Sequence, residues 1–142
     1  MTILVTGARG MIGSHLVKGL LDAGYDVIGV DRTGEESCGD NFCNIKADLS
    51  DKEKLQFIAD NHKVDRIIHL AALAHTSGET DLSWERYKHI NVDCAKNVFD
   101  VAGERPVLFI STVDVFGFYD GKEPVNGNQG IKADLLKIWK GQ

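Results

Sequence analysis

Three glycines near the N-terminus are spaced as in a loop that binds phosphate. Gly7, Gly10 and Gly13 follow the apolar run at residues 3–5 and lead into apolar residues at helical spacing. In such a strand-to-helix turn, glycines permit the tight bend, admit a pyrophosphate to the backbone and let helix and strand pack closely. The phosphates would lie at the positive end of the helix. Since any sharp turn favours glycine, the triplet needs a second signal.

An aspartate after the next strand supplies that signal. Residues 25–30 form a second buried run after Gly24, and Asp31 stands 18 residues beyond Gly13. A carboxylate near this spacing accepts hydrogen bonds from the ribose hydroxyls of a dinucleotide, although Asp31 taken alone could also be a turn or cap residue. Arg9 and Arg32 could hold a 2′-phosphate, which the Asp31 carboxylate would repel. The pattern therefore favours NAD, with NADP as the less favoured alternative.

Composition narrows the class of protein. The 142 residues suit one domain, and 43% hydrophobic with 26% charged residues are globular values. A net charge of −5 without basic runs gives no footprint for nucleic acid, and the absence of a long apolar run or signal peptide predicts no membrane partner. We expect a soluble, cytoplasmic protein. Cys38, Cys43 and Cys94 match neither a disulfide framework nor a zinc site, so we expect free thiols and no metal.

The elements that would position these residues alternate along the chain. A capping box of Ser50 and Glu53 predicts the start of a second helix, and a third, long helix ends at Gly103. Asn91 lies on the apolar stripe of that long helix, as a hydrogen-bonded structural residue or as part of a polar site. Further strands are expected at 41–46, 64–70 and 107–110, with helices from 12, from 50 and over 83–102.

Alternating strands and helices require parallel strands with right-handed crossovers. The fold class is therefore α/β, a Rossmann-type doubly wound parallel sheet of about five strands. Ligands of such sheets bind outside the carboxyl ends of the strands. The unusual groups of this chain all follow strand ends: the glycine turn, Asp31, Asp48, Ala71-Ala72 and Ser111-Thr112.

Together these motifs resemble the extended branch of the short-chain dehydrogenase/reductase family, which includes NAD-dependent sugar-nucleotide epimerases and dehydratases. The resemblance covers about residues 1–117 as the N-terminal, cofactor-binding part of the family, so the sheet is truncated relative to it. It rests on Thr6-Gly7-x-x-Gly10-x-x-Gly13, Asp31, Asp48-Leu49, His69-Leu70-Ala71-Ala72, Asn91 and the stretch from Ser111-Thr112 to Gly117.

The resemblance implies a role for each matching residue. The pyrophosphate would be lined by Gly7, Arg9, Gly10, Met11 and Ile12, with Gly13 completing the turn. Asp31 and Arg32 would take the adenosine ribose, and Asp48 and Leu49 would border the adenine. Leu70, Ala71 and Ala72 would lie along the nicotinamide-side ribose, with Asn91 and Ser111 supporting the cofactor site. Thr112 would be the hydroxyl that bonds a substrate oxygen, the one matching residue of the catalytic set.

The resemblance also implies a catalytic tyrosine followed four residues later by a lysine, whose charge lowers the pKa of the phenol. The three tyrosines, Tyr25, Tyr87 and Tyr119, are followed at that spacing by Gly29, Asn91 and Glu123.

Three functions remain open without that pair. In the first, the chain binds NAD(H) without completing epimerase or dehydratase chemistry, as a shortened product or a repurposed domain. In the second, it is an enzyme that acts on a sugar nucleotide and is completed by another chain or by an unconventional group such as Asp114. In the third, it is a non-enzymatic dinucleotide-binding or interaction module. A homodimer through helix 83–102 and the Trp139 region is a further expectation.

Overall fold

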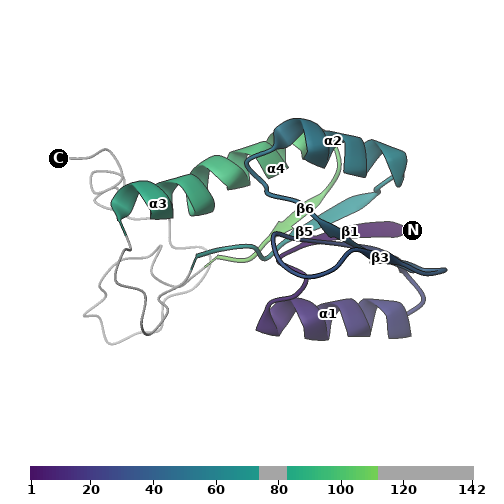
Figure 1. Ribbon diagram of the computed structural model, residues 1–142. Coiled ribbons are helices and arrows are strands. Elements are labelled where there is room, and N and C mark those ends of the chain that lie inside the picture. Colours follow the sequence, from purple (N-terminus) through teal and green to yellow (C-terminus); the bar gives the residue numbers. More distant parts are fainter. Residues whose placement is uncertain (74–82, 112–142) are drawn as a thin grey trace, which may run out of the picture. The chain divides into compact units, whose positions relative to one another are not determined.

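The computed structural model describes residues 1–73 and 83–111. Residues 1–109 form one compact unit, and residues 110–142 form a second. All the helices and strands described below belong to the first unit (Figure 1). That one domain extends to residue 142 stays a prediction.

The first unit is built on a six-stranded sheet in the order β3-β4-β2-β1-β5-β6. All neighbouring strands are parallel except β3, which pairs antiparallel with β4. The alternating sequence thus gives the predicted doubly wound sheet, with one strand more than expected. The bounds are β1 (Thr2–Thr6), β2 (Asp26–Asp31), β3 (Ser37–Cys38), β4 (Phe42–Lys46), β5 (Arg66–His69) and β6 (Val107–Phe109).

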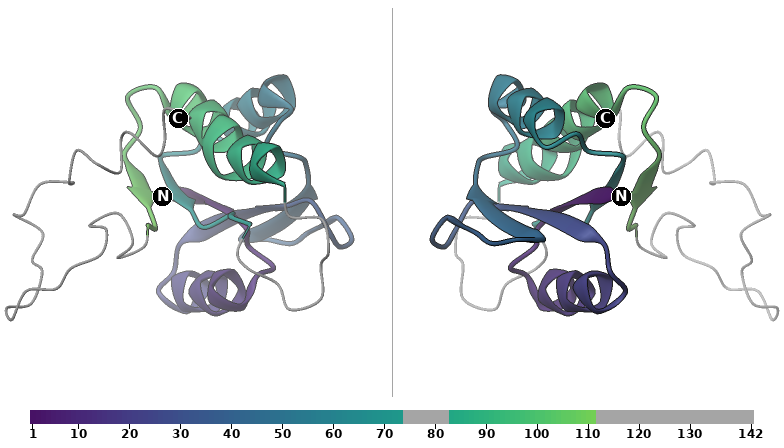
Figure 2. Two further views of the ribbon diagram at one scale, coloured as in Figure 1. Left: turned by 90° about the vertical axis from the view of Figure 1, so that its left-hand side faces the viewer. Right: turned by 90° about the vertical axis from the view of Figure 1, so that its right-hand side faces the viewer.

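Helices cover both faces of this sheet (Figures 1 and 2). Helix α1 (Met11–Asp22) packs on one face, where Val17 meets Ile3 and Val5 of β1. Helices α2 (Lys52–Asn61) and α4 (Cys94–Ala102) pack on the other, where Leu55 and Val98 meet Leu4. Since successive side chains of a strand point to opposite faces, β1 supplies both cores. This central strand therefore fixes the turn that follows it.

The predicted long helix is interrupted. Helix α3 (Trp84–Lys88) is capped by Ser83 and runs into a π-helical turn, η1 (His89–Asp93), before α4 begins. Gly103 ends α4, as predicted. The π-helical turn contains Asn91, and π-bulges are frequent at functional sites.

One prediction about local structure is wrong, and one strand was not predicted. The side chain of Asp51, not Ser50, caps α2 by accepting from the amide of Lys54, so the predicted capping box does not form. Strand β3, at residues 37 and 38, is an element that the sequence did not predict.

The cysteine prediction is also wrong, since a disulfide joins Cys38 and Cys43 and leaves Cys94 as a buried free thiol. Antiparallel pairing of β3 with β4 places the two cysteines opposite each other, with Cα atoms 4.0 Å apart. Within residues 1–73 and 83–111, no helix is long and apolar enough to cross a membrane.

Candidate dinucleotide site

The turn between β1 and α1 packs against the ends of two neighbouring strands. Gly7 adopts a φ of 68°, in the left-handed region that favours glycine, and its amide donates to the carbonyl of Val30 at the end of β2. A Cβ on Gly7 would lie 2.8 Å from the amide nitrogen of Ala71, just after β5. Gly13 is equally confined, because its Cβ would overlap the carbonyl oxygen of Gly7. The glycine spacing thus brings three strand ends together.

The N-terminus of α1 presents backbone donors to this turn. In the described part of the chain, no side chain caps the helix and its first turn holds no acidic residue. The amides of Met11, Ile12 and Gly13 have no intrahelical acceptor, as in the first turn of any helix. Met11 is 81% exposed and Ile12 59% exposed, so these apolar side chains turn outward and do not cover the helix end. The arrangement can bind an anion such as a pyrophosphate.

Asp31 lies at the end of β2 beside this turn. One carboxylate oxygen accepts from the amide of Arg9 at 3.2 Å, and the other accepts from the amide and hydroxyl of Thr33 at 3.1 and 2.9 Å. These bonds hold the carboxylate in one orientation. The guanidinium of Arg9 packs over Gly34, where a Cβ would collide with it. Arg9 and Arg32 are both exposed residues.

A buried pair links the ends of β1 and β5. The hydroxyl of Thr6 lies 2.6 Å from Nδ1 of His69, and the same oxygen accepts from the amide of Ala71 at 3.4 Å. The tautomer of the His69 ring decides whether Thr6 donates to Nδ1 or accepts from it, since a hydroxyl oxygen has one proton and two lone pairs. Burial lowers the pKa of His69, and its ring stacks on Phe109 with centroids 5.6 Å apart. The pair anchors the segment that begins at Leu70, whose amide donates to the carbonyl of Thr6.

Asp48 follows β4 at the same edge of the sheet. Its carboxylate accepts from both the amide and the hydroxyl of Ser50, and these bonds lower the pKa of Asp48, as do the nearby charges of His89 and Arg32. Asp48 is therefore ionised at neutral pH. The carbonyl of Leu49 accepts from the side chain of Asn97 on α4, which fixes the loop against that helix.

The amide side chain of Asn91 is satisfied by one residue. Its oxygen accepts from the amide of Leu73 at 2.6 Å, and its nitrogen donates to the carbonyl of Leu73 at 3.0 Å. Of the two alternatives for this residue, the structure shows the hydrogen-bonded one. By bonding both backbone groups of Leu73, Asn91 ties the segment holding Ala71 and Ala72 to the π-helical turn. It thus positions a strand end of the candidate site.

Most of the predicted site residues gather at one edge of the sheet. The residues at the carboxyl ends of β1, β2, β4 and β5 are Gly7 to Gly13, Asp31, Arg32, Asp48, Leu49, Leu70, Ala71 and Ala72. Ser111 is exposed two residues beyond β6 and belongs to the second unit. Thr112, the predicted catalytic residue, lies outside the described residues, as do Asp114, Tyr119 and Trp139.

Sequence reasoning missed two polar contacts that shape this edge. The Thr6–His69 pair joins residues 63 apart, and only the register of β1 with β5 reveals it. Thr33 bonds Asp31 over two residues, and the usual turn chemistry of aspartate could have indicated this bond. The first contact orients the segment after β5, and the second orients the Asp31 carboxylate, and the sequence predicted both as parts of the site.

The comparison with protein families decides the relationship. The family described as NAD dependent epimerase/dehydratase matches residues 3–132. The chain belongs to this family. Among curated relatives, UDP-glucose 4-epimerase of Drosophila melanogaster is 30% identical over 144 residues, covering 82% of this chain and 38% of the relative. The bifunctional protein gal10 of Schizosaccharomyces pombe is 36% identical over 129 residues, covering 81% of this chain and 18% of gal10.

Solved structures agree with this membership. UDP-glucose 4-epimerase from Bifidobacterium longum, in complex with NAD⁺ and UDP, gives a TM-score of 0.76 at 26% identity, covering 92% of this chain and 42% of that one. The fold also matches UDP-glucose-4-epimerase from Stenotrophomonas maltophila, which holds NAD and formylated UDP-arabinopyranose, with a TM-score of 0.78 at 24% identity over the full chain and 50% of that structure. The chain spans less than half the length of these two curated relatives.

Proposed function

We propose that this chain binds NAD(H) at the carboxyl ends of β1, β2, β4 and β5 and forms the cofactor-binding part of an epimerase/dehydratase. The observation that carries the proposal is the uncapped N-terminus of α1 beside the ordered carboxylate of Asp31. These two features fit the two polar parts of a dinucleotide, a pyrophosphate and an adenosine ribose. The NAD named in the structures of the two UDP-glucose 4-epimerases supports it.

Each residue would have a distinct task. The amides of Met11, Ile12 and Gly13 would donate to the pyrophosphate, where Gly7 and Gly10 leave room. Asp31 would accept from the ribose hydroxyls, with Arg32 at its side. Asp48 and Leu49 would border the adenine, and Leu70 to Ala72 would lie along the nicotinamide-side ribose. When bound, the nicotinamide would accept and return a hydride.

The state of Asp31 favours NAD over NADP. The carboxylate is held by three donors, and in this proposal the ribose would lie beside it. A 2′-phosphate there would place two anions side by side, which disfavours NADP. The exposed guanidinium of Arg32 and that of Arg9 over Gly34 are the groups that would oppose this preference.

We further propose that the 142 residues alone do not complete epimerase or dehydratase turnover. None of the three tyrosines is followed four residues later by lysine, so the proton-transferring pair of the wider family is absent from this sequence. Thr112 would then bond a substrate oxygen without a partner acid. A sugar nucleotide is the proposed substrate class of the completed protein, because the relatives are UDP-glucose 4-epimerases.

A titration of NADH fluorescence tests the cofactor proposal. We expect saturable binding of NADH and weaker binding of NADPH by the 142-residue chain. Asp31→Asn removes the charge while keeping an acceptor for Thr33, and should weaken NADH about tenfold, as expected when a hydrogen bond to a charged group is lost. The matched control is Asp65→Asn, since Asp65 also accepts from a backbone amide, that of Thr2 at the opposite edge of the sheet.

Two outcomes would contradict the proposal. No binding at millimolar NADH would remove the cofactor function, and equal effects of Asp31→Asn and Asp65→Asn would remove the role of Asp31. The catalytic part is tested separately by incubating the purified chain with NAD and a UDP-hexose. We expect no more than trace conversion, and robust turnover would refute the claim that the chemistry is incomplete.

A further inference from the structure

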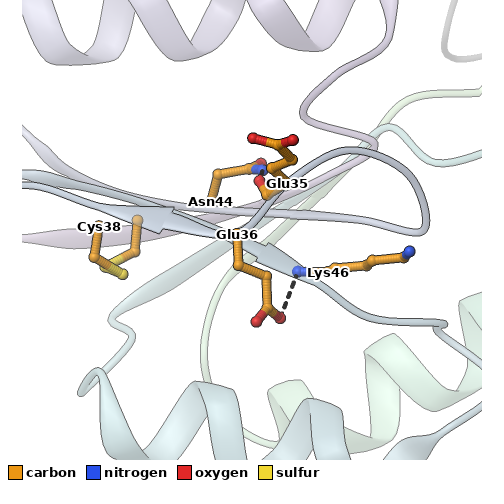
Figure 3. Close-up of a disulfide and its surroundings, with 6 residues drawn as sticks. Glu35, Glu36, Cys38, Asn44 and Lys46 are labelled. Carbon is orange, nitrogen blue, oxygen red and sulfur yellow. Dashed lines mark hydrogen bonds between the residues drawn. A yellow bond between two sulfur atoms is a disulfide. The ribbon is translucent and has the colours of Figure 1, made fainter.

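The Cys38–Cys43 disulfide closes a hairpin that follows directly on the Asp31 segment. Figure 3 shows the bridge on β3 and β4, with Glu35, Glu36, Asn44 and Lys46 around it. Residues 32–41 are all exposed, so this stretch lacks a core of its own. Cys38 is an exposed residue and Cys43 a half-buried one, so the bridge lies at the surface side of β4.

Few other contacts hold residues 32–41, which include β3, to the rest of the sheet. Strand β3 has two residues, a length that is marginal without further packing. Asn44, only 4% exposed, donates to the carbonyl of Glu35 at 2.7 Å, and Glu36 accepts from the amide of Lys46 at 3.1 Å. The turn adds two backbone bonds, from Gly39 to Phe42 and from Val27 of β2 to Asn41. Apart from the backbone of the turn, the disulfide is the one covalent link between β3 and β4 in the described residues.

The hairpin is continuous with groups assigned to the dinucleotide site. Thr33 donates to the Asp31 carboxylate, and the Arg9 guanidinium packs over Gly34. The next residue, Glu35, accepts a hydrogen bond from the side chain of Asn44 through its carbonyl. If β3 leaves β4, Thr33 and Gly34 are no longer held from the Glu35 side. Ligand binding must then order residues 32–41 again, which costs affinity.

We propose that the Cys38–Cys43 pair is a thiol–disulfide switch that controls NAD affinity at the adenosine end of the site. The inference rests on the proposed NAD-binding function. With the disulfide intact, Asp31, Thr33 and Arg9 are preorganised and binding is tight. With both thiols reduced, β3 detaches more often from β4 and binding weakens.

A dithiol is the chemical class of reductant required. One of its thiolates attacks a sulfur of the bridge, which breaks the S–S bond and forms a mixed disulfide. Its second thiolate displaces the remaining cysteine sulfur and becomes part of a cyclic disulfide. Two electrons pass from the dithiol to the cystine, and two protons end on the thiols of Cys38 and Cys43. Cys94 takes no part, because it is buried in the core and its pKa is raised by that burial.

NADH titrations of the 142-residue chain in two redox states test the switch, with dithiothreitol as the dithiol. We expect reduction to weaken NADH binding three- to tenfold. The double variant Cys38→Ser, Cys43→Ser should match the reduced chain in both conditions. Cys94→Ala, the matched control, should keep the full response. Mass spectrometry of unreduced peptides should show Cys38 joined to Cys43 before reduction.

Limited proteolysis separates hairpin opening from general unfolding. A glutamate-specific protease should cut after Glu35 and Glu36 faster in the reduced chain, while cutting after Glu53 on α2 stays unchanged. Equal NADH affinity in the two redox states, tighter binding on reduction, or unchanged cutting at Glu35 and Glu36 would overturn the switch. Failure to bind NADH in either state would overturn the proposed function itself, and the switch with it.

Discussion

Replacing Gly7 by alanine should damage both the fold and the site, and Gly24 provides a matched comparison. Both glycines have positive φ, 68° at Gly7 and 82° at Gly24, a conformation that costs an L side chain about 1–2 kcal/mol. A Cβ at Gly24 meets nothing within 4 Å. A Cβ at Gly7 would lie 2.8 Å from the nitrogen and 2.9 Å from the Cα of Ala71, which are backbone atoms held by β5.

The steric clash with the backbone of Ala71, which only Gly7→Ala creates, makes the two variants differ. Forcing a methyl group into a filled space adds about 1–3 kcal/mol, so Gly7→Ala should lose about 3 kcal/mol of unfolding free energy against about 1 kcal/mol for Gly24→Ala. At roughly 3–4 °C per kcal/mol, the melting temperature should fall by about 10 °C and about 4 °C. Moving Ala71 also distorts the proposed site, so NADH affinity should fall at least about tenfold only in Gly7→Ala.

Thermal unfolding followed by circular dichroism, with NADH titrations below the transition, gives both numbers for each variant. Equal melting temperatures for Gly7→Ala and Gly24→Ala would refute the reasoning about close packing. A Gly7→Ala chain that is folded and binds NADH with unchanged affinity would refute the placement of the cofactor at this turn.

Two further predictions concern the end of β5. Asn91→Ala removes both hydrogen bonds to Leu73 and should lower the unfolding free energy by about 2 kcal/mol in urea titrations, whereas loss below about 0.5 kcal/mol would show that the bonds contribute little. The lowered pKa of His69 means that, between its folded value and 6.5, the unfolded chain binds more protons, so stability falls as pH drops below about 6.5. This dependence should be shallower in His69→Asn when unfolding is measured from pH 7 to 5, and identical slopes would contradict it.

The parallel sheet could be predicted because its signals are local and strong. Apolar runs such as 3–5 and 25–30 become strands buried on both faces, and the stripe through Val17 becomes the buried side of α1. Gly7 and Asp31 were recognisable because a sharp turn and a strand end each require a particular residue type. Their positions at one edge follow from parallel pairing alone.

Strand β3, the disulfide and the π-helical turn depend on contacts between separate segments, which local sequence patterns do not indicate. Strand β3 has two exposed residues, so no alternation of apolar and polar side chains marks it. The Cys38–Cys43 pairing depends on that strand, although the turn residues Gly39, Asp40 and Asn41 between the cysteines are typical of a hairpin. The π-helical turn at Asn91 depends on Leu73, a residue 18 positions earlier.

The central claim is that the N-terminus of α1 receives the pyrophosphate of NAD. Titration of ¹⁵N-labelled chain with NAD⁺ tests it most directly, because amides that bind phosphate show large shift changes in heteronuclear NMR spectra. The account predicts the largest changes at Met11, Ile12 and Gly13, with little change along α2 from Lys52 to Asn61. Unchanged amides at 11–13 in the presence of saturating NAD⁺, or changes centred on α2, would contradict it.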